Sequence, residues 1–226
     1  MKGIIDHLRS KILYAENNPH NLKPDATIKT AVIRKIARCE FEKVEHLNKS
    51  NLFGVCEILL NSGDWRERTI AFQWAYRIRK YYSSEDFQRF TGWIKRYITD
   101  WGPCDDFCTH AFGYYLYKFP DHLYSIPLWT RSENRWFRRG AAVVLIYSIR
   151  RGENYHIAFK VADMLLEDHD HLVQKGYGWM LKEISKKDQK LVFNYVMERV
   201  KIMPRTALRI AVEKFDQELR LKAMRK

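Results

Sequence analysis

The sequence lacks long hydrophobic runs. Its longest uncharged apolar stretch covers residues 140–149, which is about half the length that an α-helix needs to cross a bilayer. The first residues, MKGIIDHLRSKILY, carry charges throughout and so lack the continuous apolar segment of a secretion signal. Both absences argue against membrane insertion and export, and we expect a soluble protein of the cytosol.

Cysteine is also scarce, with four residues in the chain, and without a secretion signal we expect no disulfides. Cys104, Cys108 and His110 have the spacing C-x3-C-x-H. Together with the H-x-H of His169 and His171, they offer a zinc site as an alternative. Because no second C-x2-C pair supports it, we interpret the cysteines as small buried hydrophobes and expect neither a metal nor a cofactor.

Positive charge, in contrast, is in excess. The chain has 40 Lys and Arg against 27 Asp and Glu, a formal net charge of +13, and a pI near 9.6. A surplus of this size usually faces a polyanion, either nucleic acid or an anionic membrane surface. With 46% hydrophobic residues the chain can bury a sizeable core. No Pro/Ser-rich linker divides it, so we expect a single domain over residues 1–226.

Helical periodicity extends over nearly the whole chain. Segments such as 65–82 and 136–151 have apolar residues at i, i+3, i+4 and i+7, whereas the alternation typical of strands is scarce. Asp64 and Glu67 resemble a capping box, and Pro103 and Pro204 suit a first helical position. The pattern predicts an all-α solenoid of about six antiparallel helical pairs, with an extra helix at the start.

One basic position recurs about every 35 residues, an interval typical of helical-pair solenoids. It is occupied by Arg34, Arg68, Arg139, Lys175 and Arg209, with Asp105 in the remaining place. A small residue follows three positions later in every repeat but the last: Ala37, Ala71, Cys108, Ala142 and Gly178, with Val212 as the exception. The single acid in a basic series makes Asp105 the first residue to question.

The basic position has two interpretations. Residues at the same phase of stacked helical pairs project in the same direction, so the five cations would line one surface and bind the phosphates of a duplex. Alternatively, each side chain covers apolar neighbours with its stem and keeps its charge in water. The net charge favours the nucleic-acid track.

The seven tryptophans fall into two groups. Five have apolar-face spacings and are expected in the core: Trp65, Trp74, Trp93, Trp129 and Trp136. Trp101 precedes Gly102–Pro103, and Trp179 follows two glycines, where close backbone approach leaves space for a ligand. Aromatic side chains beside bases or sugars are typical of nucleic-acid grooves, although core burial is the alternative for both.

Four strings resemble the AlkD-like DNA alkylation repair family of HEAT-like repeat DNA glycosylases, in the same order and at comparable intervals. They are WGPCDDFC (101–108), NRWFRRGAAVVL (134–145), VQKGYGWMLKEISK (173–186) and MPRTALRIAVEKF (203–215). The resemblance implies a HEAT-like solenoid with a concave basic groove. It also implies hydrolysis of the N-glycosidic bond of cationic N3- and N7-alkylated purines, such as 3-methyladenine and 7-methylguanine, in duplex DNA and without base flipping.

The same resemblance assigns residues. It places the catalytic carboxylate on Asp105, the active-site tryptophans on Trp101 and Trp179, and the active-site arginine on Arg139. The expected DNA-binding residues are Arg34, Arg68, Lys175, Arg205 and Arg209.

One departure from the family concerns the spacing of Trp101 and Asp105. Gly102–Pro103 lies between them, and we expect Pro103 to start the helix, which leaves Trp101 outside it. Asp106 is an alternative functional acid. Alternatively, Asp105 only stabilises the dipole of its own helix.

The implied partner is double-stranded DNA carrying alkylated purines. We expect a monomer at the nucleoid that has no contact with membranes and acts in base-excision repair. Two alternatives stay open: a non-catalytic binder of distorted or branched DNA, and a helical-repeat scaffold for protein interactions.

Overall fold

The computed structural model describes residues 2–225, and over these residues the chain is helical without a strand. An isolated bridge between Leu22 and Ile28 is the one β-type pairing in this range. No helix in the described range is both long and apolar enough to cross a membrane. The chain forms two compact units, which divide at Ser83–Ser84. The all-α prediction is thus confirmed, while the repeat number and the concave groove stay predictions.

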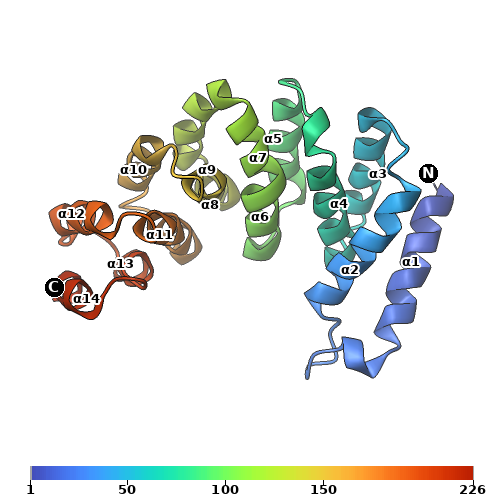
Figure 1. Ribbon diagram of the computed structural model, residues 1–226, viewed down its shortest axis with the longest axis horizontal. Coiled ribbons are helices and arrows are strands. Elements are labelled where there is room, and N and C mark those ends of the chain that lie inside the picture. Colours follow the sequence, from blue (N-terminus) through green and yellow to red (C-terminus); the bar gives the residue numbers. More distant parts are fainter. Residues whose placement is uncertain (1, 226) are drawn as a thin grey trace. The chain divides into compact units, whose positions relative to one another are not determined.

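Among its described residues, the first unit contains four α-helices (Figure 1). They are α1 (Lys2–Glu16), α2 (Thr30–Glu40), α3 (Lys49–Asn61) and α4 (Trp65–Arg77). Helix α4 packs against both α2 and α3, and the buried indole of Trp74 donates a 2.8 Å hydrogen bond to the carbonyl of Ala37 on α2. Asp64 caps α4 as predicted, but Glu67 pairs with Arg9 of α1 (2.7 Å) and does not complete a capping box.

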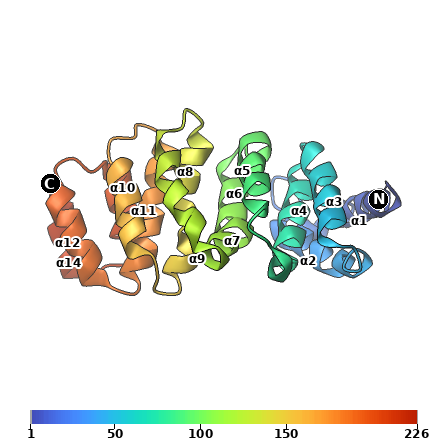
Figure 2. The ribbon, with the colours of Figure 1, turned by 90° about the horizontal axis from the view of Figure 1, so that it is seen from above.

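The second unit contains ten further α-helices among its described residues (Figure 2). They are α5 (Asp86–Tyr97), α6 (Trp101–Phe107), α7 (Gly113–Lys118), α8 (Arg135–Val143), α9 (Ile146–Ile149), α10 (Tyr155–Met164), α11 (His171–Ser185), α12 (Gln189–Arg199), α13 (Arg205–Ala211) and α14 (Gln217–Met224). A π-helical turn, η4 (Cys108–Phe112), joins α6 to α7, and a 3-10 segment, η5 (Pro120–Arg131), precedes α8. Helices α6 and α7 consequently lie end to end (Figure 1).

The residues that recur about every 35 positions all lie on helices that form one row within each unit. They lie on α2 and α4 of the first unit and on α6, α8, α11 and α13 of the second. Within each unit, consecutive members of this row contact one another: α2 with α4, α6 with α8, α8 with α11, and α11 with α13. Most of these helices begin after an Asp or Asn cap, namely Asp64, Asp100, Asn134 and Asp170. The repeating residue therefore lies about one turn into each helix.

The small residues three positions later, and Val212, are all buried. Gly178 shows why size matters, because a Cβ atom there would lie 2.8 Å from the carbonyl oxygen of Ala207 on α13. Val212, the exception in sequence, follows the last residue of α13, where the helix has already ended. The periodic pattern thus records the packing of one helix row.

A cluster of aromatic rings packs around the C-terminal end of α6. Phe107 lies between Phe90 and Trp93 of α5, with ring centroids 5.4 and 5.6 Å apart, and Phe112 of η4 lies 5.5 Å from Phe90. All four rings are buried. Because Phe107 is the last residue of α6, this packing holds that end of the helix in the core.

The tryptophan predictions hold for three of the five core candidates. Trp74, Trp93 and Trp129 are buried. Trp65 is 38% exposed, so its prediction is wrong: it is the first residue of α4 and has no preceding turn to cover it. Trp136 is half-buried with the Arg135 guanidinium over its ring at 6.0 Å.

Candidate active site

The structure brings Asp105 of α6 and Arg139 of α8 together. The Arg139 side chain donates from Nε to Oδ1 (2.9 Å) and from Nη2 to Oδ2 (2.8 Å). This two-point contact uses the planar guanidinium to fix the orientation of the carboxylate. The one acid in the repeating series is thus paired with the base that follows it in the series.

The pair is shielded from solvent unequally. The Arg139 side chain is 6% exposed, whereas the Asp105 side chain retains 18%. Burial raises the pKa of the Asp105 carboxyl above its ordinary value, and the hydrogen bonds and charge of Arg139 oppose that rise. Asp105 is therefore an oriented carboxylate that a ligand can still reach.

Arg139 also ties the pair to α11. Its Nη1 donates to the carbonyl oxygen of Leu172 in the first turn of that helix. A Cβ atom on Gly176 would lie 3.1 Å from Cγ of Arg139, so the glycine makes room for the arginine stem. Three donors of Arg139 are occupied by protein acceptors, and the residue links three successive helices of the row.

Trp101 lies on the same helix as Asp105. Helix α6 begins at Trp101, whose backbone N–H donates a 2.7 Å hydrogen bond to Oδ1 of the capping residue Asp100. The prediction that Pro103 starts this helix is therefore wrong. Pro103 is the third helical residue, where its missing N–H costs nothing because first-turn N–H groups have no intrahelical acceptor. Trp101 and Asp105 are thus four residues apart on continuous helix, and the indole is 53% exposed.

Asp106 has a different environment. Its carboxylate is 10% exposed and lies 3.4 Å from Nδ1 of His110, one turn further along. Cys104 and Cys108 on the same segment are buried free cysteines. No group of three or more His, Cys, Asp or Glu residues is arranged for a metal ion within residues 2–225.

Trp179 on α11 has partners that the sequence did not reveal. Its Nε1 donates to Oε1 of Glu183 (2.8 Å), and the Arg150 guanidinium lies 5.9 Å from its ring centre. Glu183 is 5% exposed and also pairs with Arg150 (3.2 Å) and Lys186 (2.7 Å). The described contacts of Trp179 are with this cluster and not with Asp105. The i, i+4 spacing of Trp179 and Glu183 was the one feature of the sequence that indicated this cluster.

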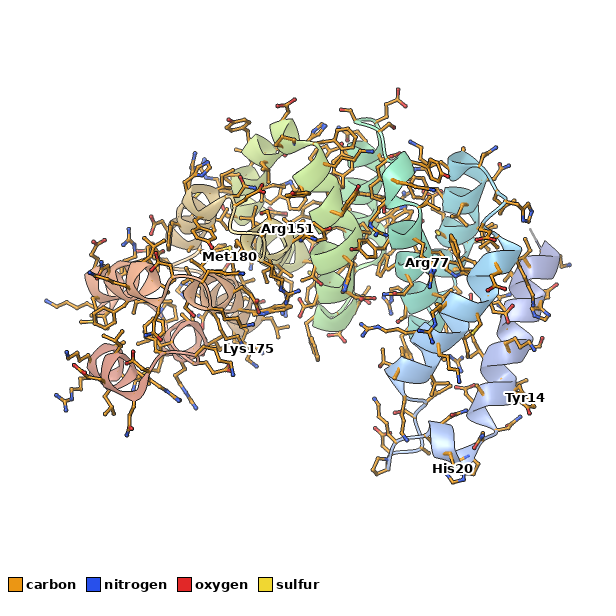
Figure 3. The ribbon with its side chains drawn as sticks, viewed as in Figure 1. Tyr14, His20, Arg77, Arg151, Lys175 and Met180 are labelled. Carbon is orange, nitrogen blue, oxygen red and sulfur yellow. The ribbon has the colours of Figure 1, made fainter. Side chains whose placement is uncertain are left out.

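The predicted DNA-binding residues divide between the two units, and in the second unit Lys175 and Arg209 lie together. Arg34 on α2 is exposed and Arg68 on α4 is half-buried, both in the first unit. In the second unit Lys175, labelled on α11 in Figure 3, and Arg209 on α13 are exposed and line one pocket. Arg205 is exposed and donates to the carbonyl oxygen of Met224 at the end of α14 (3.1 Å).

These features define an all-helical protein in which an arginine orients a carboxylate one helical turn from an exposed tryptophan. The family model of DNA alkylation repair enzymes matches residues 23–215, and the chain belongs to this family. No curated protein matches the chain significantly.

Two solved structures share the fold. A predicted DNA alkylation repair enzyme from Enterococcus faecalis is 18% identical, with a TM-score of 0.75 over 93% of this chain and 96% of that one. AlkD2 from Streptococcus mutans is also 18% identical, with a TM-score of 0.64 over 93% of this chain and 99% of its own. At this identity the likeness concerns the fold.

Proposed function

We propose that the protein is a DNA glycosylase of base-excision repair. Its substrates are duplex DNA molecules that carry cationic N3- or N7-alkylated purines, 3-methyladenine and 7-methylguanine among them. The observation that carries the proposal is the oriented, partly accessible carboxylate of Asp105 on the same helix face as the exposed Trp101. Family membership supplies the setting of DNA alkylation repair.

The chemistry requires little more than one anion. An alkylated purine already carries positive charge and leaves without a general acid, so cationic character develops on the deoxyribose. Two unit charges about 4 Å apart at an effective dielectric near 20 interact by roughly 4 kcal/mol. Since about 1.4 kcal/mol corresponds to a factor of ten, this stabilisation is worth about a thousandfold in rate. Neutral purines gain too little from it to be released.

Asp105 also has the capacity to hold the attacking water. An ionised carboxylate has about four lone-pair sites, and Arg139 occupies one on each oxygen. The remaining sites on the accessible side accept a hydrogen bond from water opposite the leaving base, as carboxylates do in glycosidases. In this proposal Arg139 orients the carboxylate and contacts no reacting atom.

The two tryptophans fit a role at the sugar and the lesion. An indole face attracts a cation with about 0.5 to 2 kcal/mol. Trp101 is exposed enough to provide that face directly, whereas Glu183 and Arg150 hold Trp179 further along α11. A cationic lesion recognised at its sugar and charge needs no base-reading pocket, which agrees with excision without base flipping.

The test is base release from methylated duplex DNA. We expect the wild-type protein to release 7-methylguanine and 3-methyladenine, quantified by chromatography, and Asp105→Asn to lose about a thousandfold of the single-turnover rate. Asp106→Asn is the matched control and should retain the wild-type rate. An inactive wild type would sink the enzyme proposal, and loss in the Asp106 variant alone would move the role to that residue.

One observation favours a second candidate, a non-catalytic DNA binder. Arg139 places a positive charge on the carboxylate at 2.8 and 2.9 Å, and that charge weakens the attraction between Asp105 and a sugar cation. A binder would retain duplex affinity in the absence of base release. The same release assay, run beside a binding measurement, separates the two candidates.

A further inference from the structure

Glu183 is a buried carboxylate near the C-terminal end of α11. Its side chain is 5% exposed, and three donors converge on it: Nε1 of Trp179 (2.8 Å) and Nζ of Lys186 (2.7 Å) on Oε1, and Nε of Arg150 (3.2 Å) on Oε2. Burial alone would raise the pKa of the Glu183 carboxyl, but these bonds prevail and lower that pKa to about 2. Glu183 is therefore ionised at any pH near neutrality.

Trp179 connects this carboxylate to the candidate active site. Residues three and four apart on a helix are neighbours on one face, and α11 follows these intervals from Leu172 to Gly176, Trp179 and Glu183. The first two of these residues receive Arg139, since the carbonyl oxygen of Leu172 accepts from its Nη1 and Gly176 leaves room for its stem. Glu183 lies a further two turns along the helix, a rise of about 10 Å. Trp179 is thus the side chain between Glu183 and the contact with Arg139.

The cluster restrains the indole at its edge and at one face. The N–H is the one hydrogen-bonding group of a tryptophan side chain, and here it is held by Glu183, while the Arg150 guanidinium lies over the ring, 5.9 Å from its centre. A charged acceptor forms a stronger bond than the neutral oxygen that would suffice for a buried N–H. The ring face opposite Arg150 is consequently the surface that Trp179 offers to a ligand.

We propose that Glu183 is a positioning residue for Trp179. By holding the indole N–H, it presents the ring face opposite Arg150 to the damaged deoxyribose, where positive charge develops. Glu183 itself contacts no reacting atom, and its effect on the reaction passes through the indole. This role rests on the proposed function, because the ring face attracts a sugar cation.

The experiment compares two duplexes, one with a cationic pyrrolidine ring in place of a deoxyribose and one with a neutral tetrahydrofuran ring. The ratio of their affinities for the full-length protein, from fluorescence anisotropy, measures the preference for a sugar cation without any base release. We expect Glu183→Met, which removes the acceptor, to lose about three- to tenfold of that preference, the value of one cation–π contact. Glu183→Gln keeps an oxygen for the indole N–H and should recover part of it. Glu213→Gln is the matched control: it removes the acid paired with Lys182 of the same helix (3.0 Å) and should leave the ratio unchanged.

A double-mutant cycle with Trp179→Phe separates positioning from general damage to the fold. If Glu183 acts through the indole, Glu183→Met has no further effect on the affinity ratio once residue 179 is changed, whereas damage to the fold would act alike in both backgrounds. Additive effects in the cycle would overturn the proposal, as would an unchanged ratio in Glu183→Met.

An NMR signal keeps this role distinguishable from the glycosylase. In protein with isotope-labelled tryptophan, the indole resonance that is missing from Trp179→Phe belongs to Trp179. It should shift when the pyrrolidine duplex binds the wild type, and shift clearly less in Glu183→Met. Such a shift in a protein that releases no methylated base would reject the glycosylase while the positioning role stands. Absence of the shift in a wild type that does release base would overturn the role of Glu183 alone.

Discussion

At the scale of single residues, the Asp105–Arg139 pair sets the protonation of the site. Burial and the guanidinium act on the carboxyl in opposite directions, and burial prevails, so its pKa is raised. The proposed chemistry needs the ionised form. Activity should therefore fall as pH drops through this raised pKa, at a higher pH than an ordinary aspartate would give.

Arg139→Gln tests that dependence. Removing the guanidinium leaves the buried carboxyl without the group that opposes its protonation, so the pKa of Asp105 rises further and the acidic limb of the rate profile moves to higher pH. Arg138→Gln is the matched control, because Arg138 lies on the same helix and pairs with Asp168 (2.7 Å). The measurement is the single-turnover release rate across pH. Identical acidic limbs in the two variants would show that Arg139 does not act through Asp105.

At the scale of secondary-structure elements, the start of α6 decides where Trp101 points. Asp100 caps the helix and lets it begin at Trp101, ahead of Gly102 and Pro103. Without the cap, the first turn would fray and the indole would lose its fixed relation to Asp105. The cap thus links a local hydrogen bond to the geometry of the site.

Asp100→Ala should cost about 1 kcal/mol of unfolding free energy and reduce base release by more than that loss of stability explains. Asp188→Ala removes the equivalent cap of α12, whose carboxylate accepts from the N–H of Leu191 (2.8 Å), and should cost similar stability with normal release. Urea unfolding and the release assay measure both quantities. Equal losses of release in the two variants would contradict the role of the Asp100 cap.

The sequence predicted the helical class better than it predicted single helix ends, and it did not predict that Asp105 pairs with Arg139. Its period followed one row of helices, and at Gly178 the close approach of Ala207 on α13 explains why the residue is small. The start of α6 was missed because proline suits the whole first turn, so its position alone could not identify the first residue. Glu183 and Arg150 were missed because they are 33 residues apart, and their contact depends on how α9 and α11 pack.

At the scale of the whole molecule, the net charge of +13 makes salt dependence the property that separates the proposed DNA binding from a protein-interaction scaffold. Many of the cations are paired with acids, as on α8, but among the described residues Lys175 and Arg209 at the pocket beside α13 have no acid at salt-bridge distance. A protein that neutralises several phosphates releases counterions, and its affinity falls steeply with salt. Charge that served solubility alone would give weak binding with little dependence on salt.

We expect the affinity for undamaged duplex DNA to fall about a thousandfold between 50 and 200 mM salt, the value for roughly six phosphate contacts. Asp105→Asn should bind at least as tightly as the wild type, because it removes a negative charge beside the DNA. Anisotropy titrations at four salt concentrations provide the measurement. A fall of less than tenfold would favour the scaffold.

The π-helical turn after α6 accommodates one extra residue in this part of the chain. A residue inserted into a regular α-helix rotates everything after it by about 100°, and a π-turn absorbs such a residue locally. Here the turn at Cys108–Phe112 separates α6, which presents Asp105 to Arg139, from α7, where Gly113 packs against Tyr147 and Val144. If one residue were deleted from this turn, the helix after it would rotate. The chain could then keep either the contact of Asp105 with Arg139 or the packing of Gly113 against Tyr147, but not both.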